Sequence, residues 1–142
     1  MLKITDAFAA MPAQDIKRAR QFYEQKLGLA PSDEQADGSV VYRVGSSGFL
    51  VFPTMGKPSG DHTQLGLDVE DLDAAVDELK SKGVKFEEYD YPNFKSENGI
   101  VKMPDGNRGA WFKDTEGNLI AVNQMVRAAT SASQRGGATT SR

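Results

Sequence analysis

Two segments of the chain carry apolar residues at helical spacing. The first spans 15–27 and the second 71–82. Each opens with an aspartate that suits an N-cap, Asp15 or Asp71, and a glycine that suits a helix stop follows each segment. The apolar positions recur every three or four residues and are Ile16, Ala19, Tyr23 and Leu27 in the first, and Leu72, Ala75, Val76 and Leu79 in the second. This pattern predicts two amphipathic helices.

The segments around each predicted helix alternate between two sets of side chains, as strands do. Around the first helix these segments are 7–13, 39–46 and 48–54, and around the second they are 64–69, 84–89, 109–114 and 118–124. Both halves therefore repeat the order strand, helix, strands, with a period of about 55 residues that indicates a duplicated unit. The alternative is an unrelated α+β order that looks duplicated by chance.

The chain has 142 residues, enough for one domain or for two small modules. We expect a first module over 1–54, a linker rich in glycine and proline over 55–61, and a second module over 62–126. The last segment, 127–142, contains no large apolar residue and is rich in Ser, Thr, Gly and Ala. Such a composition predicts a disordered tail.

Composition excludes several classes of protein. The sequence has no cysteine, so disulfides, thiolate metal sites and cysteine nucleophiles are absent. Its net charge is −3 with basic and acidic residues interleaved, which argues against a nucleic-acid partner. No apolar run is long enough for a signal peptide or a membrane span, so we expect a cytoplasmic protein without a membrane partner.

Three stretches resemble one known superfamily. DIKRARQFYEQKLGL and DVEDLDAAVDELKSKGVKF are similar to the module signatures of the vicinal oxygen chelate superfamily, which includes glyoxalase I, bleomycin resistance proteins and extradiol dioxygenases, and WFKDTEGNLI is similar to its closing hairpin. The resemblance spans 6–125 and implies an α+β fold. It implies two βαβββ modules that form a curled mixed sheet around a shared cavity, with the helices outside. It also implies a homodimer or pairing of modules within the chain.

Metal-using relatives take their ligands from the first and last strand of each module. By motif, these positions are Phe8, Val51 (to within one residue), Gln64 and Ala121 in this sequence. Only one of the four carries a lone-pair donor, and neither carboxylate nor imidazole is among them. We therefore expect neither a metal nor another cofactor. A degenerate site made of His62, Gln64 and Asn123 is the alternative.

Other chemically active side chains have simpler structural interpretations. His62 is the only histidine and lies in a linker-like stretch, where it is either solvated or an acid–base group at the cavity mouth. Asp114 and Glu116 invite an acid–base interpretation. However, DTEGN is typical of a turn in which the aspartate accepts backbone N–H groups and Gly117 supplies a positive φ.

The remaining candidate site is a cavity lined by aromatic and amide side chains. The expected ligand-binding residues are Phe8, Tyr42, Phe49, Val51, His62, Gln64, Trp111, Ala121 and Asn123, with Leu65, Leu67, Val69, Ile120 and Val122 facing the helices. In the other register of the third strand, Arg43 takes the place of Tyr42. Trp111 suits the stacking of flat or cationic ligands, and Tyr89, Tyr91 and Phe94 are either a lid or the cover of a helix end. A cavity filled by its own side chains is the alternative.

The sequence thus predicts a metal-free protein that binds a small aromatic or apolar molecule for sequestration or sensing. Two alternatives remain: a glyoxalase-like lyase, isomerase or other metal-dependent enzyme with an atypical site, and a structural domain with a filled cavity.

Overall fold

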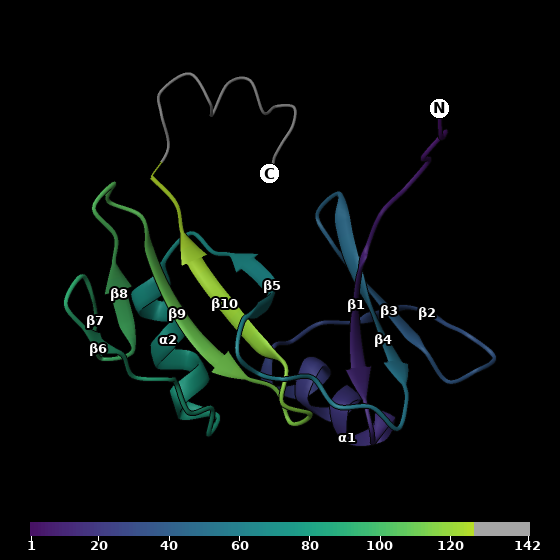
Figure 1. The fold of residues 1–142 in the computed structure, drawn as a ribbon. Helices are drawn as coiled ribbons and strands as arrows, with labels where there is room; N and C mark the ends of the chain where they lie inside the picture. The colour runs from purple at the N-terminus through teal and green to yellow at the C-terminus, as the bar shows by residue number, and fades with distance from the viewer. Residues whose placement is uncertain (127–142) are drawn as a thin grey trace. The chain divides into compact units, whose positions relative to one another are not determined.

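Residues 1–126 are described by a computed structural model, in which the chain forms two units (Figure 1). Among the described residues, the first unit contains Met1–Leu65 and Lys113–Leu119, and the second contains Gly66–Phe112 and residues 120–126. The predicted disordered tail lies outside the described residues. The predicted linker, 55–61, contains neither helix nor strand.

The first unit has the order strand, helix and three strands. Its elements are β1 (Ala9–Ala13), α1 (Ile16–Gln21), the π-helix η1 (Phe22–Lys26), β2 (Pro31–Glu34), β3 (Val40–Val44) and β4 (Ser47–Pro53). The sheet order is β1-β4-β3-β2, with β1 parallel to β4 and the other pairs antiparallel. The predicted helix 15–27 is confirmed in extent, although its second half is a π-helix.

The core of the first unit is aromatic. The Tyr23 ring from η1 lies 5.7 Å from the Tyr42 ring and 5.3 Å from the Phe49 ring, and the latter two rings are 5.4 Å apart. All three side chains are buried. Burial first, and then the neighbouring carboxylate of Asp114, raises the pKa of Tyr23, so its hydroxyl stays a hydrogen-bond donor.

The second unit repeats the order of the first with an added hairpin. Its elements are β5 (Thr63–Asp68), α2 (Leu72–Ser81), β6 (Asp90–Tyr91), β7 (Phe94–Glu97), β8 (Ile100–Lys102), β9 (Arg108–Lys113) and β10 (Leu119–Gln124). The sheet order is β5-β10-β9-β8-β7-β6, so the first strand again lies beside the last, as in the first unit. This shared order confirms the predicted duplication and the α+β class.

Four short strands, β2, β6, β7 and β8, are not predicted by the alternation, and the predicted strand 84–89 is wrong, because that segment forms only an isolated bridge at Phe86. β2 carries the polar sequence PSDE, and the segment expected to be a loop around 89–98 forms the β6–β7 hairpin. β7 then turns into β8 through Asn98 and Gly99, both with positive φ, a geometry typical of a two-residue hairpin. These strands are held by pairing with neighbouring strands, and the alternation of side chains along the sequence does not reveal such pairing.

Each helix begins with the expected aspartate as N-cap. In each case a side chain from a distant part of the sequence accepts a further backbone N–H group at the helix start. Asp15 Oδ1 accepts the N–H of Arg18 at 3.0 Å, and Asp71 Oδ1 accepts the N–H of Ala74 at 3.0 Å. In α2, the Leu72 N–H also donates to Gln124 Oε1 at 2.8 Å. Unpaired N–H groups of the first turn thus find side-chain partners in each unit.

The turn between β9 and β10 belongs to the first unit and holds the start of α1. Glu116 Oε1 accepts the Asp15 N–H at 3.1 Å, the role that a glutamate inside the helix has in a capping box. The same carboxylate accepts two hydrogen bonds from the Arg18 guanidinium, at 2.7 and 3.0 Å. Asp114 Oδ1 accepts the N–H groups of Glu116 and Asn118 at 2.8 and 2.9 Å, which confirms its predicted turn role.

Replacing Glu116 with glutamine is expected to reduce the amount of unfolding free energy that is lost when the pH falls from neutral to acid. Burial acts to raise the pKa of Glu116, but hydrogen bonds from Arg18, Asp15 and Thr115 outweigh it and hold the pKa below its ordinary value of 4.5. The ionised carboxylate therefore stabilises the fold fully above that value, and this contribution is lost as the pH falls through the folded-state pKa.

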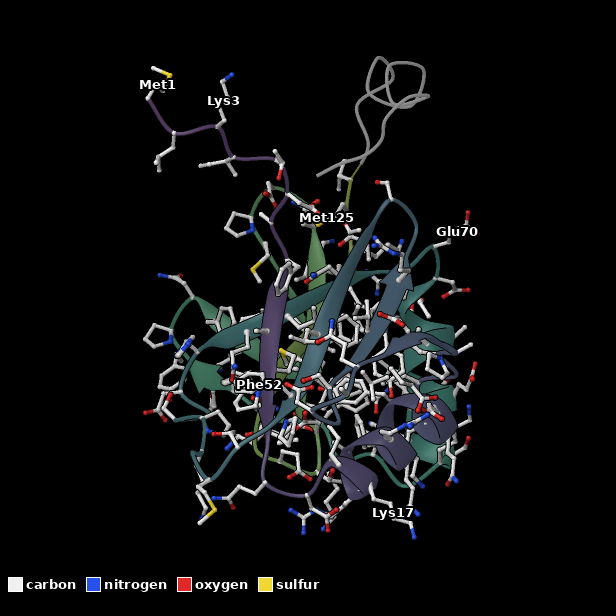
Figure 2. All side chains as sticks on the ribbon, turned by 90° about the vertical axis from the view of Figure 1, so that its right-hand side faces the viewer. Met1, Lys3, Lys17, Phe52, Glu70 and Met125 are labelled. Carbon is white, nitrogen blue, oxygen red and sulfur yellow. The ribbon has the colours of Figure 1, made fainter. Side chains whose placement is uncertain are left out.

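Urea unfolding of wild type and Glu116→Gln should differ by roughly 1–2 kcal/mol near neutral pH and by less in acid. Glu70→Gln, at an exposed glutamate that points away from the ribbon in Figure 2, is the matched control and should keep the wild-type profile. A Glu116→Gln difference that stays constant from neutral to acid pH would contradict this prediction.

No helix among residues 1–126 has both the length and the apolar character needed to cross a membrane.

Candidate ligand-binding site

The strands of the second unit separate their side chains into two rows. One row faces α2, because Arg108 hydrogen-bonds to Asp73 of that helix and Gln124 caps its first turn. By the period of two, Ala110 and Phe112 join Arg108 on this side. Ile120 and Val122 join Gln124 there and are buried, as expected from the sequence. The opposite row carries Gly109, Trp111, Ala121 and Asn123.

Three aromatic side chains gather on the row opposite α2, and we call Tyr89, Phe94 and Trp111 the aromatic platform. The ring centroids are 5.2 Å apart for Tyr89 and Phe94, 5.6 Å for Tyr89 and Trp111, and 5.4 Å for Phe94 and Trp111. Each ring is only partly buried. Two of these residues were predicted as a lid or a helix-end cover, and the structure places both against Trp111.

Glycines beside the platform make room for the indole and for one amide. A Cβ atom on Gly109 would lie 3.1 Å from Trp111 Cη2 and 3.0 Å from Asn123 Oδ1. A Cβ atom on Gly66, in β5, would lie 3.6 Å from Asn123 Nδ2. The Asn123 amide therefore lies over the glycines of both neighbouring strands. This places a hydrogen-bonding group next to the stacking surface.

Replacing Gly109 with alanine is expected to displace the indole of Trp111. The new methyl group would be closer to the ring than ordinary contact allows, so the ring must move, at a cost of about 1–3 kcal/mol in unfolding free energy. The shift should appear in the emission maximum and near-ultraviolet circular dichroism of Trp111, the only tryptophan. Gly66→Ala is the matched control, since its Cβ makes only ordinary contact. Unchanged spectra for Gly109→Ala would refute the close packing.

In the first unit, the expected orientation of three residues is wrong. Tyr42, Phe49 and Val51 were placed on the cavity side, yet all three are buried in the core that contains Tyr23. The cause is the parallel register Ala9↔Phe49 and Met11↔Val51, which puts Phe49 and Val51 on the helix side. The face away from the helix carries Ala10, Pro12, Leu50 and Phe52.

The other predicted site residues differ in their exposure and in their partners. Phe8 precedes β1 and is 66% exposed. His62 is exposed in the segment before β5, with Nδ1 3.4 Å from Ser59 Oγ. Gln64, which groups with the first unit, has a buried Oε1 without a hydrogen-bond partner among the described residues. Ala121 is 4% exposed, so its methyl group is covered.

The residues at the usual ligand positions do not suit a metal. In the first unit, Leu50 points away from the helix beside Val51 and is equally apolar, so a one-residue shift adds no donor. In residues 1–126, His, Cys, Asp and Glu side chains do not form a group of three that suits a metal ion. A divalent cation requires several imidazole or carboxylate ligands, and this donor set supplies one amide.

The structure also has two open hollows, one of which is bordered by Phe94 of the platform, and the arginine that borders each of them is paired. One of ≈ 450 Å³ in the first unit borders Arg20, which binds Glu24 at 2.9 Å and Glu34 at 3.2 Å. Lys17 also borders it and points outward in Figure 2. The other, of ≈ 530 Å³ in the second unit, borders Arg108, which binds Asp73 at 2.9 Å. We therefore consider the aromatic platform the better candidate.

The two βαβββ units and their sheet order define the class, an α+β protein built from a duplicated unit. The sequence model of the Glyoxalase/Bleomycin resistance protein/Dioxygenase superfamily matches residues 7–122. The chain belongs to this superfamily. No curated protein sequence is significantly similar to it.

Solved structures share the fold at low sequence identity. TnmS3, an antibiotic binding protein from Streptomyces sp. CB03234, is 20% identical with a TM-score of 0.62, over 89% of this chain and 100% of that chain. A lactoylglutathione lyase from Agrobacterium tumefaciens is 15% identical with a TM-score of 0.64, over 87% and 95%. A glyoxalase / bleomycin resistance protein from Catenulispora acidiphila DSM 44928 is 20% identical with a TM-score of 0.62, over 85% and 98%. At these identities the likeness concerns the fold alone.

Proposed function

We propose that this protein is a metal-free small-molecule-binding protein of the glyoxalase/bleomycin-resistance type that sequesters or senses a flat aromatic or apolar ligand. The observation that carries the proposal is the aromatic platform: three rings in mutual contact that are each left partly exposed. Rings that served only the core would be expected to be covered. A flat ligand on this surface would gain both apolar burial and offset or edge-to-face ring contacts.

The chemistry of the platform supports binding rather than catalysis. Its members are two hydrocarbon-like rings, one phenol and the neighbouring amide of Asn123. Burial first, and then the nearby charge of Glu87, raises the pKa of Tyr89, so its phenol stays protonated near neutral pH. A group of this kind donates or accepts a hydrogen bond to a ligand but is a poor general base. The amide and the phenol would set the orientation of a ligand that the rings hold.

The test is a titration of Trp111 fluorescence with a library of flat aromatic antibiotics and metabolites. Because the chain contains a single tryptophan, any change in emission reports on the platform. We expect saturable quenching by at least one compound, with a rise in melting temperature that follows mass action, about 2.7 kcal/mol of stabilisation at a hundredfold excess over Kd.

Trp111→Phe is the matched control for this experiment. It removes the signal but keeps an aromatic ring, so calorimetry should still detect binding of the same compound. Quenching that rises linearly without saturation for every compound, together with unchanged melting temperatures, would overturn the proposal.

A further inference from the structure

Glu87 lies on the same side of the second unit as the aromatic platform. Phe86 forms a bridge with Phe112, and their rings are 5.5 Å apart on the side that faces α2. The next residue therefore points the other way, and the Glu87 N–H donates to the Trp111 carbonyl at 2.8 Å. Glu87 and Tyr89 are two residues apart on an extended segment and so share the side of Trp111.

The Glu87 carboxylate is close to the platform and has no cation of its own. Its charge acts on Tyr89, and the side chain is partly buried. Within residues 1–126 no hydrogen bond or ion pair reaches this carboxylate. Its acidic neighbours are already engaged: Glu88 accepts a hydrogen bond from Ser96 Oγ at 2.7 Å, and Asp90 pairs with Lys95 at 3.6 Å. Glu87 thus adds an uncompensated negative charge beside three aromatic rings.

We propose that the aromatic platform selects flat ligands that carry a positive charge, of the N-alkylated or protonated heteroaromatic class. This inference rests on the proposed function and specifies its ligand. A cation over an aromatic face is attracted by the negative centre of the ring, and a carboxylate at the edge adds a direct Coulombic attraction.

Two ligands that differ only in charge test the inference. Quinoline and N-methylquinolinium have the same ring system, and quinoline is neutral in buffer well above its pKa. In calorimetric titrations of the full chain we expect N-methylquinolinium to bind about tenfold more tightly than quinoline. Added salt should weaken binding of the cation and leave binding of quinoline nearly unchanged.

The variant Glu87→Gln tests whether this carboxylate is responsible. It should bring the affinity for N-methylquinolinium to within about twofold of the affinity for quinoline, without changing quinoline binding. Glu70→Gln removes the same charge at an exposed position before α2 and should retain the wild-type preference. Melting curves of both variants check that the fold is kept.

The outcomes separate this inference from the proposed function. If both ligands bind equally, the charge selectivity is wrong. If Glu87→Gln keeps the tenfold preference, the inference is also wrong, because the selectivity does not come from this carboxylate. In both cases the aromatic binding site stands. If neither ligand binds, both the inference and the proposed function fail.

Discussion

Replacing Asp114 with alanine is expected to lower the free energy of unfolding by about 3–5 kcal/mol, more than the loss expected for Glu116→Gln. Asp114 is buried, and four groups donate to its carboxylate. Oδ1 accepts two backbone N–H groups of its own turn. Oδ2 accepts the Tyr23 hydroxyl at 2.5 Å and Asn118 Nδ2 at 2.8 Å. Alanine leaves these donors inside the protein without an acceptor.

The cost is large because the donors that lose their acceptor are buried and cannot form hydrogen bonds to water instead. Tyr23 is fully buried, and the hydroxyl of a buried tyrosine without a partner carries its whole desolvation penalty. Asn118 is also buried and additionally donates to the Pro12 carbonyl at 3.0 Å, which ties the turn to β1. Loss of the carboxylate therefore disturbs both η1 and the end of β1.

Urea unfolding monitored by circular dichroism measures the change. Asp114→Asn should lie between wild type and alanine, because an amide keeps one acceptor but presents an N–H group where an oxygen is needed. Asp33→Ala, at an exposed position in β2, is the control for loss of an aspartate and should change stability by no more than about 0.5 kcal/mol. An Asp114→Ala protein as stable as Asp33→Ala would show that the four hydrogen bonds contribute little.

Replacing Trp111 with alanine is expected to weaken ligand binding by about tenfold to a hundredfold, or roughly 1.4–2.8 kcal/mol. The indole contacts both other rings of the platform, so its removal deletes one stacking surface and lets Tyr89 and Phe94 move. The effect on stability should be smaller than for a fully buried aromatic residue, because the indole is only partly buried.

Calorimetry with the best compound from the fluorescence titration measures this loss of affinity. Trp111→Phe should recover most of the affinity, since a phenyl ring retains a smaller stacking surface. Phe52→Ala, which removes a ring from the first unit, is the control for nonspecific loss of aromatic surface and should bind as wild type does. Equal affinities for wild type and Trp111→Ala would place the ligand elsewhere.

Local sequence signals predicted the features that depend on neighbouring residues. The two aspartate caps, the turn at Asp114 and the burial of Ile120 and Val122 follow from spacing within a few residues, and the structure confirms each. The shared strand order of the two units also follows from the repeat. These features need no knowledge of which strand pairs with which.

Features set by distant pairing were missed or wrong. The side on which Phe49 and Val51 lie depends on the parallel register between β1 and β4, and a shift of one residue reverses it. Glu116 caps a helix that begins about a hundred positions earlier in the sequence, so no local motif reveals its role. The position of Glu87 follows from one bridge between Phe86 and Phe112. In each case the feature depends on a contact between residues that are far apart in the sequence.

The turn 113–119 decides where this chain can be divided into fragments. Although it connects two strands of the second repeat, it supplies the cap of α1 and the acceptor for Tyr23 in the first unit. A gene fragment that ends in the 55–61 segment would therefore encode the first repeat without its own closing piece. Such a fragment would lack the acceptor for the buried Tyr23 hydroxyl, so we expect that the two repeats do not fold independently when the chain is divided at this segment.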